Sequence, residues 1–200
     1  HTEAVTSIVG RAELWAFFWS LIAIYFFIRK NTLLSAVSFL LALLSKEVAL
    51  MVLPITFYID WILLKNRFSL TIKRILFFAL PLGIYSILRY VALGQYFFGD
   101  SATTVVTNPL KFASFNERVI TAFKVLYLYL EKLTWPIHLS ADYSYNSIPV
   151  ISNLFDPSFL FGIVFFGLLV LFLLYKKTNR TVLAFGSLIF LAPYFMVSNL

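Results

Sequence analysis

The chain has 200 residues, of which 61% are apolar, 19% are aromatic and only 12% are charged. Soluble domains are about half apolar and a quarter charged, so this composition excludes an ordinary soluble protein and indicates an all-α, polytopic membrane protein. The net charge of +7 does not indicate nucleic-acid binding, because the basic residues lie in short clusters between apolar runs. Without cysteine, the chain has neither disulfides nor thiolate metal sites.

Apolar segments of membrane-spanning length recur along the chain. They predict six transmembrane helices, which in chain order cover residues 4–28, 32–44, 48–64, 75–93, 159–175 and 181–197. Pro54 and Pro81 fall inside two of these spans and should kink them. We expect residues 1–200 to be part of one membrane domain. Because the first residue is His rather than Met, we also expect the chain to be an internal piece of a longer protein.

The distribution of charge predicts the topology. Three short connections carry nine of the 16 Lys and Arg residues, and they lie at 29–30, 65–74 and 176–180. Six spans put all three connections on one side, which the positive-inside rule makes cytoplasmic. Eight of the nine acidic residues then lie on the opposite, outer side, and Asp60 is the exception.

Residues 94–158 are predicted to form an outer loop that contains an interfacial or re-entrant helix at about 118–137. This helix is long enough to cross the bilayer, but Lys124, Glu131 and Lys132 interrupt it. If it crossed, the basic connection at 176–180 would move to the outer side, against the charge bias. The bias therefore favours a helix at the outer interface, with a crossing helix as the alternative.

Polar residues from several segments meet at the outer side in this topology. Within the first predicted span, Glu3, Ser7, Gly10 and Arg11 share one stripe at about 100° per residue, so its outer part should line a hydrated cavity. The other polar segments contribute Lys46, Glu47, Arg89, Asn108, Asp142 and Tyr143. Ionisable groups in membrane proteins usually mark a pathway or a site.

Simpler interpretations remain open for several of these residues. Arg11 and Glu13 could be headgroup contacts of long side chains, and Glu3 could stabilise the positive end of a helix dipole. Asp142 could form an Asx turn in its loop.

Lys46 and Glu47 are sequence neighbours and cannot pair on one helix face. We therefore favour two separate partners for them over a local turn contact.

An outer cavity of this kind suits a substrate that is part lipid and part polar. Arg11, Lys46 and Arg89 would hold a lipid phosphate. Glu3 would deprotonate an acceptor hydroxyl or hold a divalent cation. These residues indicate group transfer from a lipid-linked substrate. A transporter with an outward-facing polar cavity and a non-catalytic membrane platform for a repeat domain are the alternatives, although the apolar mid-span positions disfavour transport.

The segments HTEAVTSIVGRAEL, LSKEVALMVLPITFYIDW and LSADYSYNSIP resemble the transmembrane and tetratricopeptide-repeat O-mannosyltransferase family of the type C glycosyltransferase superfamily. The resemblance covers essentially all 200 residues. It implies transfer of a sugar, typically mannose, from a polyprenyl (dolichyl) phosphate to a Ser or Thr hydroxyl of an acceptor protein. It also implies an integral protein of the lipid bilayer, in the endoplasmic reticulum membrane of a eukaryote or the cytoplasmic membrane of a prokaryote.

The resemblance also implies roles for particular residues. Glu3 would be an acidic residue of the catalytic site, acting as base or binding the phosphate or a divalent cation (Mg²⁺ or Mn²⁺). The alternative is that Glu3 is the second acidic residue and that the catalytic carboxylate precedes His1. The substrate-binding residues would be Arg11, Lys46, Glu47, Arg89, Asn108, Asp142 and Tyr143. The first acidic outer loop of the superfamily would precede His1, and the repeats would follow Leu200. We therefore expect the 200-residue piece to be inactive by itself.

Overall fold

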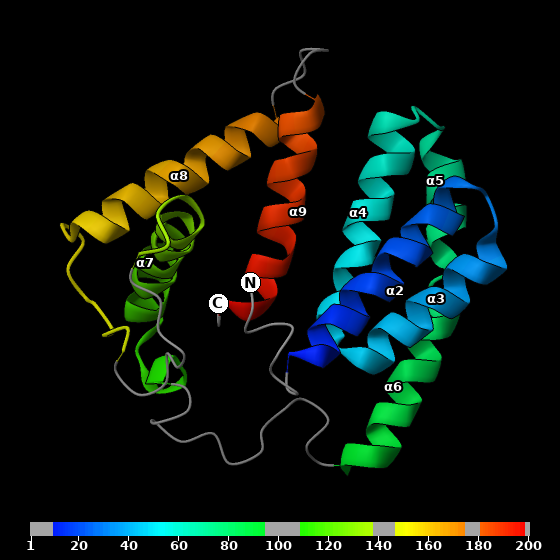
Figure 1. Cartoon of the computed structure of the whole chain (residues 1–200), viewed down its shortest axis with the longest axis horizontal. Coiled ribbons are helices and arrows are strands. Elements are labelled where there is room, and N and C mark those ends of the chain that lie inside the picture. The colour runs from blue at the N-terminus through cyan, green and yellow to red at the C-terminus, as the bar shows by residue number, and fades with distance from the viewer. Residues whose placement is uncertain (1–9, 95–108, 138–146, 175–180, 199–200) are drawn as a thin grey trace. The chain divides into compact units, whose positions relative to one another are not determined.

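The computed structural model describes residues 10–94, 109–137, 147–174 and 181–198. These residues form helices joined by turns and extended segments, and no strand occurs among them. The expectation of an all-α protein is thereby confirmed. The chain divides into two compact units, His1–Gly99 and Asp100–Leu200, called unit 1 and unit 2 below. Figure 1 shows the helices of each unit, which we describe separately.

Unit 1 begins with an antiparallel pair of helices. The elements of the unit are α2 (Arg11–Ile28), α3 (Thr32–Ser45), the 3₁₀ helix η1 (Glu47–Met51), α4 (Val52–Tyr58), the π-helical turn η2 (Ile59–Leu63), α5 (Phe68–Leu76) and α6 (Ala79–Leu93). The turn between α2 and α3 places Lys30 at a positive φ of 60°. Asn31 then caps α3, because its side chain accepts a hydrogen bond from the Leu34 N–H at 3.1 Å.

The two prolines lie directly after changes in helix geometry. The helix predicted over 48–64 is present, but it changes from 3₁₀ to α to π along its length. Pro54 is the third residue of α4, and Pro81 is the third residue of α6, which follows a turn at 77–78. Proline has no N–H, and it is tolerated in the first helical turn, where that donor is not needed. The predicted interruptions therefore lie just before each proline. The helix changes from 3₁₀ to α geometry before Pro54, and a turn precedes α6 before Pro81.

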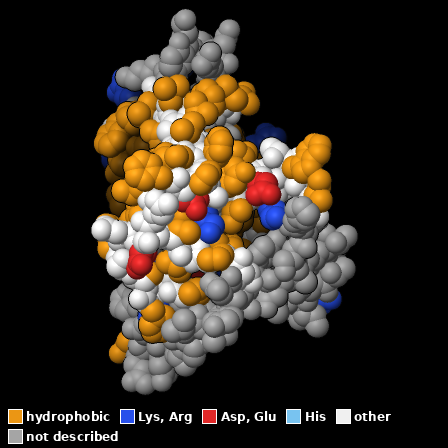
Figure 2. Space-filling model, turned by 90° about the vertical axis from the view of Figure 1, so that its left-hand side faces the viewer, with side chains coloured by type: hydrophobic (Ala, Val, Ile, Leu, Met, Phe, Trp, Pro, Cys, Tyr) orange, Lys and Arg blue, Asp and Glu red, His pale blue; other side chains and the backbone are white. Residues whose placement is uncertain are grey.

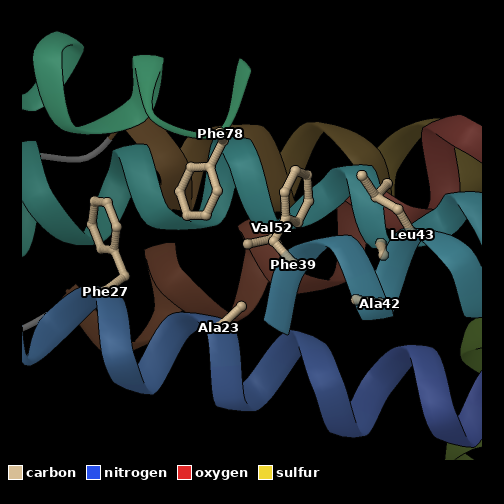
Figure 3. Close-up of a cluster of buried hydrophobic side chains, with 8 residues drawn as sticks. Ala23, Phe27, Phe39, Ala42, Leu43, Val52 and Phe78 are labelled. Carbon is tan, nitrogen blue, oxygen red and sulfur yellow. The ribbon is translucent and has the colours of Figure 1, made fainter. Parts of the chain in front are cut away.

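Small and aromatic side chains form the core of unit 1. Phe78, at the break between α5 and α6, stacks on Phe27 at 5.7 Å between ring centroids and meets Phe39 edge-on at 4.9 Å. Figure 3 shows these rings converging between the ribbons. The Ser35 hydroxyl donates a buried hydrogen bond of 2.8 Å to the Ala23 carbonyl. Small residues with interhelical hydrogen bonds are typical of helix contacts in membranes, so α2 and α3 pack closely.

The buried Asp60 accounts for the acidic residue on the basic side of the predicted topology. Its side chain is fully buried and forms an ion pair with Arg74. It also accepts hydrogen bonds from Asn66 at 2.9 Å and Thr71 at 2.7 Å. The Arg74 guanidinium donates to the Phe27 carbonyl and lies 4.2 Å from the centroid of the Phe27 ring. These contacts offset the cost of burying two charges and join α2, η2 and α5.

Unit 2 contains a short 3₁₀ helix, η4 (Pro109–Phe112), and three long helices: α7 (Phe115–Thr134), α8 (Pro157–Leu174) and α9 (Thr181–Val197). A capping box begins α7, in which the Ser114 N–H donates to the Glu117 carboxylate at 2.9 Å and the Ser114 hydroxyl accepts from the Glu117 N–H. The hydrogen bonds from Ser114 lower the pKa of Glu117.

A close approach of two backbones joins α7 to α8. A Cβ atom added at Gly162 of α8 would lie 1.9 Å from the Phe123 carbonyl oxygen of α7. The Tyr194 hydroxyl of α9 donates to the Ala122 carbonyl on the same turn of α7. Both α8 and α9 therefore contact the backbone of α7 directly.

The polar side of α7 contacts the extended chain that precedes α8. The Ile151 N–H donates to the Thr121 hydroxyl at 3.0 Å, and Lys124 donates to the Pro149 carbonyl at 3.0 Å. Lys124, which interrupts the apolar sequence of this helix, therefore has a local structural partner.

Three helical runs are long and apolar enough to cross a membrane within the described residues: Arg11–Ile28, Phe68–Leu93 and Pro157–Leu174. Thr32–Ser45 and Val182–Met196 are shorter apolar helices, and α7 is not among the candidates. The predicted segments are thus helical, but a count of six spans is not confirmed. Large apolar side chains of α8 are exposed, and Figure 2 shows hydrophobic side chains over much of the described surface that faces the viewer.

Candidate functional site

Two ion pairs lie at the end of unit 1 where α2 begins and α3 ends. Glu13, in the first turn of α2, pairs with Lys46, the residue that follows α3. Lys46 is extended, with φ −162° and ψ 141°, so the chain changes direction before η1 begins at Glu47. Glu47 pairs in turn with Arg89 of α6, at 3.6 Å. Charges from three separated parts of the sequence therefore lie at one end of unit 1, and we call Glu13, Lys46, Glu47 and Arg89 the outer charge cluster, after the side on which the sequence predicts them.

Tyr85 orients the guanidinium of this cluster. Arg89 donates a hydrogen bond of 2.6 Å from Nη1 to the Tyr85 hydroxyl. The two residues are four apart on α6, a spacing that brings side chains together on one helix face. The Arg89–Glu47 distance of 3.6 Å is longer than a hydrogen bond, so that contact is mainly an electrostatic attraction.

The side chains of the cluster remain accessible to solvent. The exposed fractions are 60% for Glu13, 36% for Lys46, 52% for Glu47 and 23% for Arg89. Exposed ion pairs contribute about 0–1 kcal/mol each. An anion such as a phosphate could therefore replace either carboxylate beside its cation at small cost, which makes the cluster a candidate anion site.

The structure brings together three of the residues predicted from the sequence. Lys46, Glu47 and Arg89 lie in one cluster, and the prediction that Lys46 and Glu47 have separate partners is confirmed. Arg11 is exposed at the start of α2, and no described residue forms an ion pair with it. The remaining predicted residues, Glu3, Asn108, Asp142 and Tyr143, lie outside the described residues. The binding roles assigned to all these residues stay predictions.

Sequence reasoning did not include Glu13 or Tyr85 in the site. The register of the helical hairpin could have found Glu13, because Glu13 precedes Lys30 by 17 residues and Lys46 follows Lys30 by 16. In an antiparallel pair, residues at similar distances from the turn lie side by side. The spacing of four residues between Tyr85 and Arg89 was an equally direct signal.

No metal site is formed by the described part of the chain, since no three of its acidic or His side chains come together. Glu13 and Glu47 each face a cation, so the pair does not fit a divalent ion. The prediction that Glu3 binds Mg²⁺ or Mn²⁺ concerns a residue outside the described ranges and stays a prediction.

The polar contacts of unit 1 lie at opposite ends of α2. Glu13 of the outer charge cluster is in its first turn, and Phe27, which accepts from Arg74, is in its last. The 18 residues of α2 extend about 27 Å, close to the thickness of a bilayer core. An apolar helical body between two polar ends defines an integral membrane protein.

Comparison with known proteins shows what the chain is similar to. The family model described as "Protein O-mannosyl-transferase TMTC, DUF1736" matches residues 101–170, which include α7 and most of α8. Protein O-mannosyl-transferase F38B6.6 of Caenorhabditis elegans is 27% identical over 205 residues, which cover the whole of this chain and 28% of that protein. No solved structure matches the chain. The resemblance to the transmembrane and tetratricopeptide-repeat O-mannosyltransferases is confirmed, and the chain spans little more than a quarter of the length of this relative.

Exchange of the charges of Glu13 and Lys46 tests their contact. Glu13→Lys and Lys46→Glu should each destabilise the protein, and the double variant should recover most of the loss, because the attraction is restored with reversed signs. The coupling free energy expected for an exposed pair is about 0.2–1 kcal/mol. Thermal unfolding of the four proteins in detergent measures it. Losses that simply add in the double variant would show that the two side chains do not interact.

Proposed function

We propose that the chain forms part of a membrane glycosyltransferase. The enzyme transfers a sugar, mannose by its family resemblance, from a polyprenyl (dolichyl) phosphate to a protein Ser or Thr hydroxyl at the extracytoplasmic or luminal face. The similarity to a protein O-mannosyl-transferase supports the reaction class. The observation that carries the assignment of a site is that Lys46 and Arg89 lie at one end of the apolar body of unit 1, each paired with a carboxylate.

The chemistry of the donor explains why two cations are needed. Transfer breaks the bond between the sugar C1 and a phosphate oxygen and forms a bond from C1 to the acceptor hydroxyl oxygen. The hydroxyl proton passes to a base, the role assigned to Glu3, and the phosphate leaves with an added negative charge. Lys46 and Arg89 stabilise that charge where it develops, while the prenyl chain lies against the apolar helices. Arg11, Glu47, Asn108, Asp142 and Tyr143 complete the binding surface in this proposal.

The experiment measures mannose transfer from dolichyl phosphate mannose to an acceptor peptide by membranes that contain the full-length protein. Lys46→Ala and Arg89→Ala should each lower kcat/KM by roughly ten- to a hundred-fold, the effect of losing one hydrogen bond to a charged group. Lys111→Ala, a matched change on the short helix η4 of unit 2, should leave kcat/KM unchanged.

Two results would contradict the proposal. One is transfer by Lys46→Ala and Arg89→Ala at the rate of Lys111→Ala, which would remove the cluster from the site. The other is flux of a solute across liposomes that survives Glu3→Gln and Lys46→Ala, which would favour transport. The 200-residue chain by itself should give no turnover.

A further inference from the structure

The end of unit 1 opposite the outer charge cluster carries exposed basic residues from two parts of the sequence. Arg29 and Lys30 lie in the turn between α2 and α3. Lys65, Arg67 and Lys73 lie between η2 and the end of α5. All five are exposed, and we call them the basic end.

The contacts of Arg74 bring these two segments together. Its guanidinium donates to the carbonyl of Phe27, two residues before Arg29, and its backbone follows Lys73 directly. Because Arg74 is also paired with the buried Asp60, this connection is held inside the protein. The buried contacts of Arg74 therefore hold the two basic segments at the same end of the unit, without the help of exposed contacts.

Among the described residues, no acidic side chain other than Asp60 lies near the basic end. Asp60 is the acidic residue of this region, and Arg74 already neutralises it in a fully buried contact. None of the five cations forms an ion pair with a described residue. A concentrated, uncompensated positive charge of this size attracts anions to the surface.

Exposed aromatic rings lie beside the basic residues. The Phe57, Trp61 and Phe68 rings contact one another, with centroids 5.4 Å apart for Phe57–Trp61 and 5.5 Å apart for Trp61–Phe68. Trp61 is 42% exposed and Phe68 is 53% exposed. Arg29 lies 5.4 Å from the centroid of the Tyr25 ring. Trp and Tyr are typical of the headgroup layer of a membrane, because their rings have an apolar body and a polar group. Trp61 and Tyr25 therefore indicate that the anions within reach of the basic residues are lipid headgroups.

We infer that the basic end binds the headgroups of anionic phospholipids in the leaflet where it lies, with the charges of two separate turns acting on the same lipids. The cationic side chains contact the phosphate and carboxylate groups, and Trp61 and Phe68 contact the upper acyl chains. The positive-inside pattern places this surface in the cytoplasmic leaflet, which carries the anionic lipids. The inference does not rest on the proposed glycosyltransferase activity.

The test uses the full-length protein in detergent with equal amounts of phosphatidylserine and phosphatidylcholine, and native mass spectrometry counts the bound lipids. The wild type should be enriched in phosphatidylserine. Lys30→Gln with Lys73→Gln should lower the enrichment by roughly five-fold for each cation removed. The enrichment should also fall as the salt concentration rises.

The matched control is Lys111→Gln with Lys132→Gln, which removes the same charge from unit 2. This control should keep the wild-type enrichment. Equal loss in the two double variants would show that net charge and not the basic end selects the lipid, and it would overturn the inference. So would an unchanged enrichment in Lys30→Gln with Lys73→Gln, or preferential binding of an acidic peptide over phosphatidylserine. Unchanged thermal unfolding of the variants confirms that the substitutions, all at exposed or half-buried positions, leave the fold intact.

Discussion

Replacement of Gly162 by alanine should separate α7 from α8 and destabilise unit 2. The added Cβ atom would lie 1.9 Å from the Phe123 carbonyl oxygen and 2.6 Å from its carbonyl carbon. Backbone atoms cannot rotate away as the end of a side chain can, so one helix must shift. Overpacking of this kind costs about 1–3 kcal/mol and occasionally more. Thermal unfolding of the chain in detergent measures the loss, and Gly162→Val should lose more than Gly162→Ala.

Gly167 provides the matched control for this prediction. It lies on the same helix α8, and a Cβ atom there would have nothing within 4 Å. Gly167→Ala should therefore leave stability unchanged or raise it by up to about 1 kcal/mol, since alanine favours the helix more than glycine does. Equal stability of Gly162→Ala and Gly167→Ala would contradict the close contact of α7 with α8.

Replacement of Asp60 by alanine should lower the free energy of unfolding by more than any single substitution in the outer charge cluster. The substitution leaves the half-buried Arg74 guanidinium without its carboxylate and removes the acceptor of Asn66 and Thr71. Loss of one partner of a buried ion pair costs about 3–5 kcal/mol. The midpoint of thermal unfolding in detergent should fall accordingly.

Glu13→Ala is the comparison, because it also removes one carboxylate from one cation. Glu13 is 60% exposed, so its loss should cost only about 0–1 kcal/mol. Asp60→Ala with Arg74→Met should be less damaging than Asp60→Ala alone, since no unpaired charge remains. Tolerance of Asp60→Ala equal to that of Glu13→Ala would show that the buried contacts do not stabilise unit 1.

The positions of the helices could be predicted from the sequence because lipid-facing and packed segments are apolar over their full length. The segment predicted over 181–197 is α9, and the segment predicted over 159–175 differs from α8 by two residues at its start. The number of these helices that cross the membrane could not be predicted in the same way. A helix such as α3, with 14 residues, is short for a span, and its depth depends on its neighbours.

The internal irregularities of the helices were only partly predictable. Pro54 and Pro81 predict interruptions of their helices, because the missing N–H is a property of the residue itself. The π-helical turn at Ile59–Leu63 has no such local cause. It occurs where Asp60 meets side chains 6, 11 and 14 residues further along the chain, and contacts at that separation are set by tertiary packing.

The sequence could predict that charged residues form the candidate site, but it could not predict which of them pair with one another. The segregation of acidic from basic residues depends on the bilayer and is visible in the sequence. The contact of Glu13 with Lys46 depends on the register of two helices, and the contact of Glu47 with Arg89 depends on the packing of α6 against α3, the helix that precedes η1. Only the exclusion of a pair between neighbouring residues, Lys46 and Glu47, followed from helix geometry alone.

The ion pairs at the two polar ends of unit 1 differ in burial, so they differ in how strongly they hold the helices together. The two ion pairs near Glu13 and Arg89 contribute about 2 kcal/mol at most to holding α2, α3 and α6 together at that end. Separating α2 from α5 near Phe27 requires the exposure of a buried charge, which costs several kcal/mol. The polar contacts therefore hold unit 1 together more firmly at the Asp60 end than at the Glu13 end.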